Sequence, residues 1–271
     1  MVSRTLYKSD TVSSVLVSLF LVIAILCSSF LAACGSSGAV PQDANPSYRS
    51  FEAITICLDT TGSVNPSFRV KAAHQIGDRI DSMTQPNTGG MAVFVNQIEN
   101  FSVQTDLVDF SVPAIAALPQ KPVPRSNPYT YAKALSDYKK QLPAALVNLH
   151  TIQAQVKQET DKIRALPLST SAGGTDIFGC FDSAADNFAS LPQNAITTIV
   201  IVSDMQNNQT LQETKTLHLQ GVTVKVYYRQ CQVASACQEN DRYWRGVLQS
   251  DGVTSVTFYS PADSQALGMS F

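Results

Sequence analysis

The chain has 271 residues, of which 44% are hydrophobic and 15% are charged, and its formal net charge is −2. A near-neutral chain argues against nucleic acid as a partner, because phosphate binding needs clustered lysine and arginine. The length suits one domain with an embellishment.

The N-terminal segment has the order of a secretory signal. Arg4 and Lys8 precede an apolar run over residues 15–33, which ends in Leu-Ala-Ala directly before Cys34. This ending resembles the lipobox of bacterial lipoproteins, in which the cysteine is lipidated and becomes the first residue. We therefore expect a signal peptide over residues 1–33, lipidation at Cys34 and a place in the bacterial cell envelope. The alternative is an uncleaved membrane-spanning helix.

A tether is expected between the lipid and the folded domain. Residues 34–50 are small, polar and proline-containing, which is typical of a flexible linker. A coil of about 15 residues reaches roughly 20–25 Å, so the domain over residues 51–271 would sit close to the membrane.

The domain alternates between apolar strands and amphipathic helices. This alternation predicts an α/β fold: a doubly wound, Rossmann-like, mostly parallel sheet with helices on both faces. Residues 90–97 and 102–112 are expected to pair as an antiparallel edge hairpin. The predicted strands are residues 54–58, 91–95, 196–203, 222–228 and 253–259, and the predicted helices are residues 66–83, 176–190, 210–219 and 241–249.

A long helical insertion is predicted over residues 129–166. Its apolar residues follow a heptad with Glu159 as the exception, and Pro143 should break or kink it into two helices or one bent helix. The stripe either packs on the sheet or folds back as a hairpin, or it forms an arm for a partner or a coiled-coil dimer. The heptad residues are Leu135, Tyr138, Leu142, Ala145, Leu149, Ile152, Val156, Ile163 and Leu166.

Three segments place short oxygen-bearing side chains after strands or in a tight loop. The first contains Asp59, Thr61 and Ser63, the second contains Thr175 after two glycines, and the third is Ser203-Asp204. Mg²⁺ takes oxygen ligands in a nearly octahedral set and usually keeps some of its waters. Two carboxylates and three hydroxyls could supply such a set, so these segments predict a metal site.

The same three motifs, in this order, resemble the von Willebrand factor A domain family and its metal-ion-dependent adhesion site. The resemblance covers about residue 49 to the C-terminus, interrupted by the helical segment. It implies Mg²⁺ or Mn²⁺ at the carboxyl end of the sheet, at the topological switch point. It also implies a protein partner whose carboxylate completes the metal's shell.

Carried over by position, the resemblance implies a role for each residue. Thr61 and Ser63 would bind the metal through their hydroxyls, Asp59 and Asp204 directly or through waters, and Thr175 in a manner that changes with conformational state. Thr61 stands where the family usually has serine, and Met205 stands where it commonly has glycine. The backbone after Asp204 could therefore follow another path.

The cysteines after the signal segment allow several arrangements. Cys231 and Cys237 flank a short polar segment, and we predict a disulfide between them. Cys57 and Cys180 are as compatible with buried free thiols as with a second bridge. A zinc site is a weaker interpretation, because the histidines show no ligand spacing with these cysteines. The loop carrying Cys231 and Cys237 is expected to shape the rim of the partner site.

The sequence therefore favours a membrane-tethered, metal-dependent protein-binding module for adhesion or assembly, without enzymatic activity. One alternative is a haloacid-dehalogenase-like phosphohydrolase with Asp59 as nucleophile. That family also needs an acidic residue a few positions beyond the last aspartate, and the next one after Asp204 is Glu213. A second alternative is a scaffold subunit that binds through the helical segment, residues 129–166.

Overall fold

The structure is a computed structural model, and it describes residues 50–99, 106–124, 127–168, 173–207, 216–231, 233–267 and 269. The chain divides into two compact units, Met1–Ser47 and Tyr48–Phe271, and the described residues all belong to the second. The signal segment, Cys34 and nearly all of the tether lie outside the described residues, so these expectations stay predictions.

Six strands form one sheet in the order β3-β2-β1-β4-β5-β6. The pairings of β1 with β2 and β4, of β4 with β5, and of β5 with β6 are parallel, and edge strand β3 pairs antiparallel with β2. This strand order, reversing direction at β1, is that of a doubly wound α/β fold, so the predicted fold class is confirmed. The strands are β1 (Glu52–Asp59), β2 (Met91–Ile98), β3 (Val108–Val112), β4 (Ile196–Val202), β5 (Thr223–Tyr227) and β6 (Ser255–Phe258).

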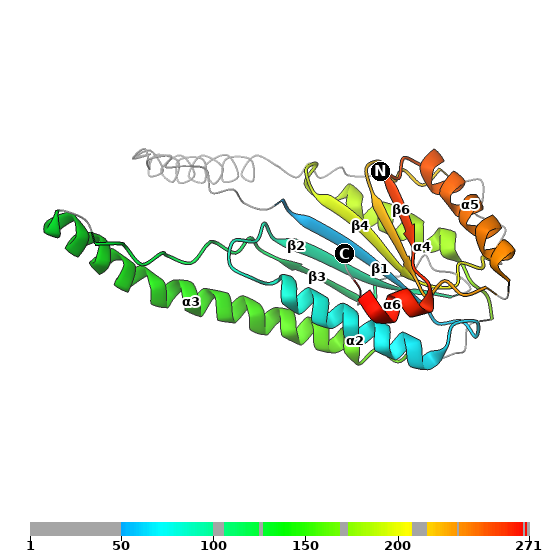
Figure 1. The fold of residues 1–271 in the computed structure, drawn as a ribbon, viewed down its shortest axis with the longest axis horizontal. Helices are drawn as coiled ribbons and strands as arrows, with labels where there is room; N and C mark the ends of the chain where they lie inside the picture. Colours follow the sequence, from blue (N-terminus) through cyan, green and yellow to red (C-terminus); the bar gives the residue numbers. More distant parts are fainter. Residues whose placement is uncertain are drawn as a thin grey trace, which may run out of the picture. The chain divides into compact units, whose positions relative to one another are not determined.

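Helices cover both faces of the sheet (Figure 1). Successive side chains of a strand point to opposite faces, so β4 sends Val200 and Val202 into one core and Ile199 and Ile201 into the other. The first core includes side chains of α2 and α3, and the second includes those of α4 and α5. The helices are α2 (Pro66–Met83), α3 (Pro128–Arg164), α4 (Ile177–Ala189), α5 (Ala234–Ser250) and α6 (Pro261–Leu267).

Two helix predictions differ from the structure. The helix predicted at residues 210–219 lies largely outside the described residues, and its last four residues are not helical. The helix predicted at residues 241–249 begins earlier, at Ala234. The side chains of its first turns are short and mostly polar and include a disulfide-bonded cysteine, so this segment lacks the apolar periodicity that predicts a helix.

The predicted insertion is one helix, α3, of 37 residues. It continues through Pro143, so the expectation of two helices or a folded-back hairpin is wrong. All of its buried residues, from Leu149 to Ile163, lie in the second half. The heptad stripe is therefore fully buried only in that half, and in the first half, which contains Pro143, its residues are only half-buried.

α3 runs antiparallel to α2. The Arg164 guanidinium donates to Asp78 at 2.8 Å and to Asp81 at 2.6 Å, while further back the Gln153 amide donates to the Thr84 carbonyl at 3.1 Å. Because Thr84 is the C-cap of α2, residues 128–148 of α3 extend past the end of that helix. Figure 1 shows this part of α3 continuing beyond α2.

We expect Val156→Ala and Val147→Ala, the same substitution at two positions of α3, to lower the free energy of unfolding by very different amounts. Val156 is 2% exposed in the core, so its loss should lower the free energy of unfolding by about 2 kcal/mol. Val147 is 66% exposed, so its loss should stay within about 0.5 kcal/mol. Urea unfolding monitored by circular dichroism measures both. Equal losses would contradict the protruding first half of α3.

Candidate metal centre

The parallel register of β1 and β4 brings the first and third motifs together. Leu58 lies opposite Val202, so the next residues, Asp59 and Ser203, leave the sheet side by side. The Ser203 hydroxyl donates to Asp59 Oδ2 at 2.6 Å, and both residues are fully buried. Two loops separated by 144 residues in the chain therefore share a hydrogen bond at the carboxyl end of the sheet.

The first motif folds around the other oxygen of Asp59. The Thr61 amide and hydroxyl both donate to Asp59 Oδ1, at 2.9 and 2.6 Å, and the Thr61 and Ser63 hydroxyl oxygens are 3.0 Å apart. Neighbouring ligands of an octahedral Mg²⁺ at about 2.0–2.1 Å from the ion lie about 2.9 Å from each other. The two hydroxyls thus already have the spacing of adjacent ligands.

Asp204 is a second buried carboxylate beside the first. Burial raises its pKa, and the charge of Asp59 raises it further, while hydrogen bonds from the Gln206 amide and the Ser63 hydroxyl act in the opposite direction. Asp204 is 4% exposed, and the Gln206 amide donates to its Oδ1 at 3.1 Å. A cation at this position would relieve the unfavourable burial of two neighbouring carboxylates.

Met205 takes the backbone conformation that glycine would favour. Its φ is 62°, in the left-handed region, and its side chain is buried in the second core. The Trp244 indole donates to the Met205 carbonyl at 3.0 Å, and the Met205 amide donates to the Ser203 hydroxyl at 2.9 Å. Packing and hydrogen bonds therefore stabilise a strained residue directly after Asp204.

Thr175 lines a cavity that Thr61 and Ser63 of the first motif also line. The cavity has a volume of about 300 Å³, and Thr175 is 4% exposed. It directly precedes Asp176, the N-cap of α4, whose carboxylate accepts from the Gly179 amide at 2.8 Å. The residues that line the cavity are Thr61, Gly62, Ser63, Gly173, Gly174, Thr175, Gln206 and Asn207.

Arg69 is a buried cation that the sequence interpretation missed. Its guanidinium donates to the carbonyl of Thr60 at 3.0 Å and also to the carbonyls of Thr61 and Val64. Burial lowers its pKa, and the negative charge of Asp59 partly offsets this effect. The side chain fixes the backbone of the first motif. In the sequence, the only indication of this role was an arginine within the apolar pattern of α2.

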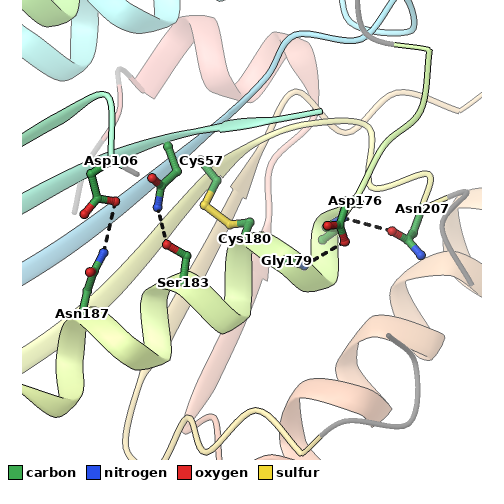
Figure 2. The surroundings of a disulfide bond; sticks show 10 residues. Cys57, Asp106, Asp176, Gly179, Cys180, Ser183, Asn187 and Asn207 are labelled. Atoms are coloured by element: carbon green, nitrogen blue, oxygen red, sulfur yellow. Dashed lines mark hydrogen bonds between the residues drawn. A yellow bond between two sulfur atoms is a disulfide. The ribbon is translucent and has the colours of Figure 1, made fainter. Parts of the chain in front are cut away.

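Asn207 joins the third motif to the second, and it too was missed. Its Oδ1 accepts from the Ile177 amide at 3.0 Å, at the start of α4 (Figure 2). The first turn of a helix leaves amides without partners inside the helix, so Asp176 and Asn207 together satisfy two of them. An asparagine three residues after Asp204 gives no indication of this contact in the sequence alone.

The five predicted ligands therefore occupy one end of the sheet, and their chemistry fits a small hard cation. Carboxylate and hydroxyl oxygens suit Mg²⁺ or Mn²⁺. In the described part of the chain, no three His, Cys, Asp or Glu side chains cluster as metal ligands. The candidate site differs from such a cluster because three of its five side chains supply hydroxyl oxygens.

Both disulfides join cysteines in the described domain. Cys231 pairs with Cys237, as predicted, and Cys57 pairs with Cys180, so the free-thiol alternative for these two is wrong. The zinc interpretation is also wrong, because all four cysteines are oxidised. Cys57 lies two residues before Asp59, and Cys180 lies five residues after Thr175. This bridge therefore ties the first motif to α4, the helix that follows the second motif.

Further contacts along α4 continue the attachment made by the Cys57–Cys180 bridge, as Figure 2 shows. One turn beyond Cys180, the Ser183 hydroxyl accepts from the Asn96 amide at 3.0 Å, and another turn on, the Asn187 amide donates to Asp106 at 3.3 Å. Burial raises the pKa of Asp106. These contacts fix α4, and with it Thr175, against β1 and β2.

No protein-family model and no curated protein sequence matches the chain. Similar solved structures include manganese-loaded TRAP of Plasmodium vivax, with 10% identity, a TM-score of 0.41, and coverage of 80% of this chain and 72% of that one. A von Willebrand factor type A protein from Catenulispora acidiphila has 14% identity, a TM-score of 0.41, and coverage of 79% and 40%. BatB from Bacteroides thetaiotaomicron has 15% identity, a TM-score of 0.35, and coverage of 80% and 95%.

These identities and TM-scores are low, so the fold class rests on the strand order given above. The helices within the described ranges include none that is long and apolar enough to cross a membrane. The residues expected to form the signal segment are outside those ranges.

We expect the two disulfides to differ in their contribution to stability. Cys57–Cys180 closes a loop with a sequence separation of 123, and Cys231–Cys237 one of 6. The chain-entropy model gives about 5 kcal/mol for the first and about 2.4 kcal/mol for the second. Urea unfolding of the two paired Cys→Ala variants measures the difference. A larger loss for the Cys231–Cys237 variant would contradict the role assigned to the long-range bridge.

Proposed function

We propose that the chain is a divalent-metal-dependent protein-binding module for adhesion or assembly, exported and held at the envelope by a lipid on Cys34. The observation that carries this proposal is the convergence of Asp59, Thr61 and Ser63, with two hydroxyl oxygens 3.0 Å apart beside a fully buried carboxylate. The motif order supports the same conclusion through its resemblance to the von Willebrand factor A domain family.

In this proposal, hydroxyl and carboxylate side chains have different roles in binding the ion. Thr61, Ser63 and Thr175 line the cavity and would supply hydroxyl oxygens, while the buried carboxylates of Asp59 and Asp204 would supply the negative charge. When bound, Mg²⁺ or Mn²⁺ would offer an exchangeable position to a carboxylate of the protein partner. Arg69 and Ser203 hold the first motif in place, which reduces the rearrangement needed when an ion enters.

The placement of Asp59 favours a binding role over the phosphohydrolase alternative. A nucleophilic carboxylate needs an oxygen that can reach the substrate. Both oxygens of Asp59 accept hydrogen bonds, and Asp59 is not among the residues that line the cavity. Loss of phosphatase activity in an Asp59→Asn variant would instead favour the enzyme.

Substitutions at two adjacent threonines should separate metal binding from stability. Thr61→Val removes the hydroxyl that lies 3.0 Å from that of Ser63 and donates to Asp59, so we expect Mn²⁺ affinity to fall by at least about tenfold. Thr60→Val removes a hydroxyl that donates to the Ile98 carbonyl, so the affinity should stay unchanged. Isothermal titration calorimetry with Mn²⁺ measures both, and a similar loss in the two variants would count against Thr61 as a ligand.

A membrane-extract pull-down should connect the metal to partner binding. We expect capture in Mg²⁺ to disappear with EDTA and in Asp59→Ala, because both remove the ion. Partner binding that survives both treatments but is lost on deletion of residues 129–166 would favour the scaffold alternative. Replacing Cys231 and Cys237 in the same assay tests whether their loop shapes the rim, and unchanged capture would argue against it.

A further inference from the structure

The protruding part of the domain lies at the end of the sheet opposite the metal centre. Residues 128–148 of α3 extend past the C-cap of α2, and at 1.5 Å per residue they span about 30 Å. The segment that leads to them leaves the sheet at the same end, because Ile115 pairs with Thr88, just after α2. We call residues 113–148 the arm; positions 125 and 126 within it are not described.

The arm carries a charge opposite to that of the whole protein. Its sequence has five basic residues and one acidic residue, Asp137, a local formal charge of +4 in a chain of net charge −2. The described basic side chains are all exposed, and they are Lys121, Lys133, Lys139 and Lys140.

The tip of the arm also exposes large apolar side chains. Tyr129 is 79% exposed and Val123 is 75% exposed, the two highest values among the exposed large hydrophobic residues described. Tyr129, Lys133 and Lys140 are spaced four and seven residues apart, so they share one face of α3. That face is opposite the heptad stripe.

The chain enters the domain at the same end. Glu52 begins β1, and its amide donates to the Gly90 carbonyl at 3.1 Å, beside the start of β2. A tether from Cys34 would therefore reach the domain on the side from which the arm projects. Its estimated reach of roughly 20–25 Å is comparable to the length of about 30 Å spanned by residues 128–148.

We propose that the arm binds an anionic phospholipid surface, with its lysines at the headgroups and Tyr129 and Val123 at the membrane–water interface. Tyrosine is favoured at such interfaces, and each lysine near an anionic surface adds to binding. The metal centre would then face away from the membrane, toward a partner. This inference uses the proposed membrane location but not the metal.

A lipid surface fits the arm better than a second copy of this chain does. In a coiled coil, the positions beside the apolar stripe carry complementary charges that select the partner. Within residues 128–148 those positions are Ala132, Ala134, Lys139, Gln141, Leu146 and Asn148, which offer no acidic partner for the lysine. The most exposed aromatic residue, Tyr129, lies on the other face of the helix and would stay outside such an interface.

Co-sedimentation with vesicles tests the proposal on the compact unit, residues 48–271, which carries no lipid anchor and contains both cores. We expect binding to phosphatidylglycerol vesicles but not to pure phosphatidylcholine. At about fivefold per lysine, K133Q with K140Q should weaken partitioning about 25-fold. Tyr129→Ser should weaken it as well, and EDTA should have no effect, so failure here is distinct from failure of the metal site.

The matched control is K157Q with K162Q, the same charge change at the other end of α3. Those lysines pair with Asp161 and Glu159 and lie on the half of the helix that packs on the domain. We expect their replacement to leave vesicle binding unchanged. Equal losses in the two double variants, no binding to anionic vesicles, or a dimer in light scattering that Leu135→Ser dissociates would each overturn the proposal.

Discussion

The register between β1 and β4 determines where the candidate site can form. These two strands are parallel neighbours at the point where the strand order reverses, so the loops that follow them leave the sheet side by side. A shift of one residue would send every side chain of β1 to the opposite face and remove Asp59 from Ser203. The apolar residues that fill the two cores therefore also fix the metal motifs, through the pleat of the strands.

Three separate contacts then limit how far the loops can move. Arg69 binds carbonyls of the first loop, Trp244 binds the carbonyl of Met205 in the third, and the Cys57–Cys180 bridge attaches the helix that follows the second. Each contact comes from a different element, and each acts on a different loop. A site held in this way needs little rearrangement to accept an ion, which favours tight binding over a large conformational response.

The sequence was sufficient for the apolar strands and for bringing the five candidate ligands to one end of the sheet, because both follow from local patterns; metal binding by these residues stays a prediction. Short apolar, β-branched runs predict β1 and β4, and short oxygen-bearing residues after them predict the site. It was insufficient for Arg69, for Asn207 and for the Cys57–Cys180 pair, whose partners are distant in the chain or belong to backbone. The heptad of α3 predicted a helix. It did not predict that the fully buried residues of α3 begin only at Leu149, near the point where α3 meets the end of α2.

Under the proposed function, force between a bound partner and the membrane would pass along β1. The tether would pull at Glu52, at one end of this strand, and the partner would pull through the loop that begins at Asp59, at the other. The load then runs through the covalent backbone of β1, while its hydrogen bonds to β2 and β4 hold the strand in place over its length. The bridge from Cys57 to α4 adds a covalent attachment near the loaded end. A central strand with parallel neighbours is therefore well suited to join a tether to an adhesive site.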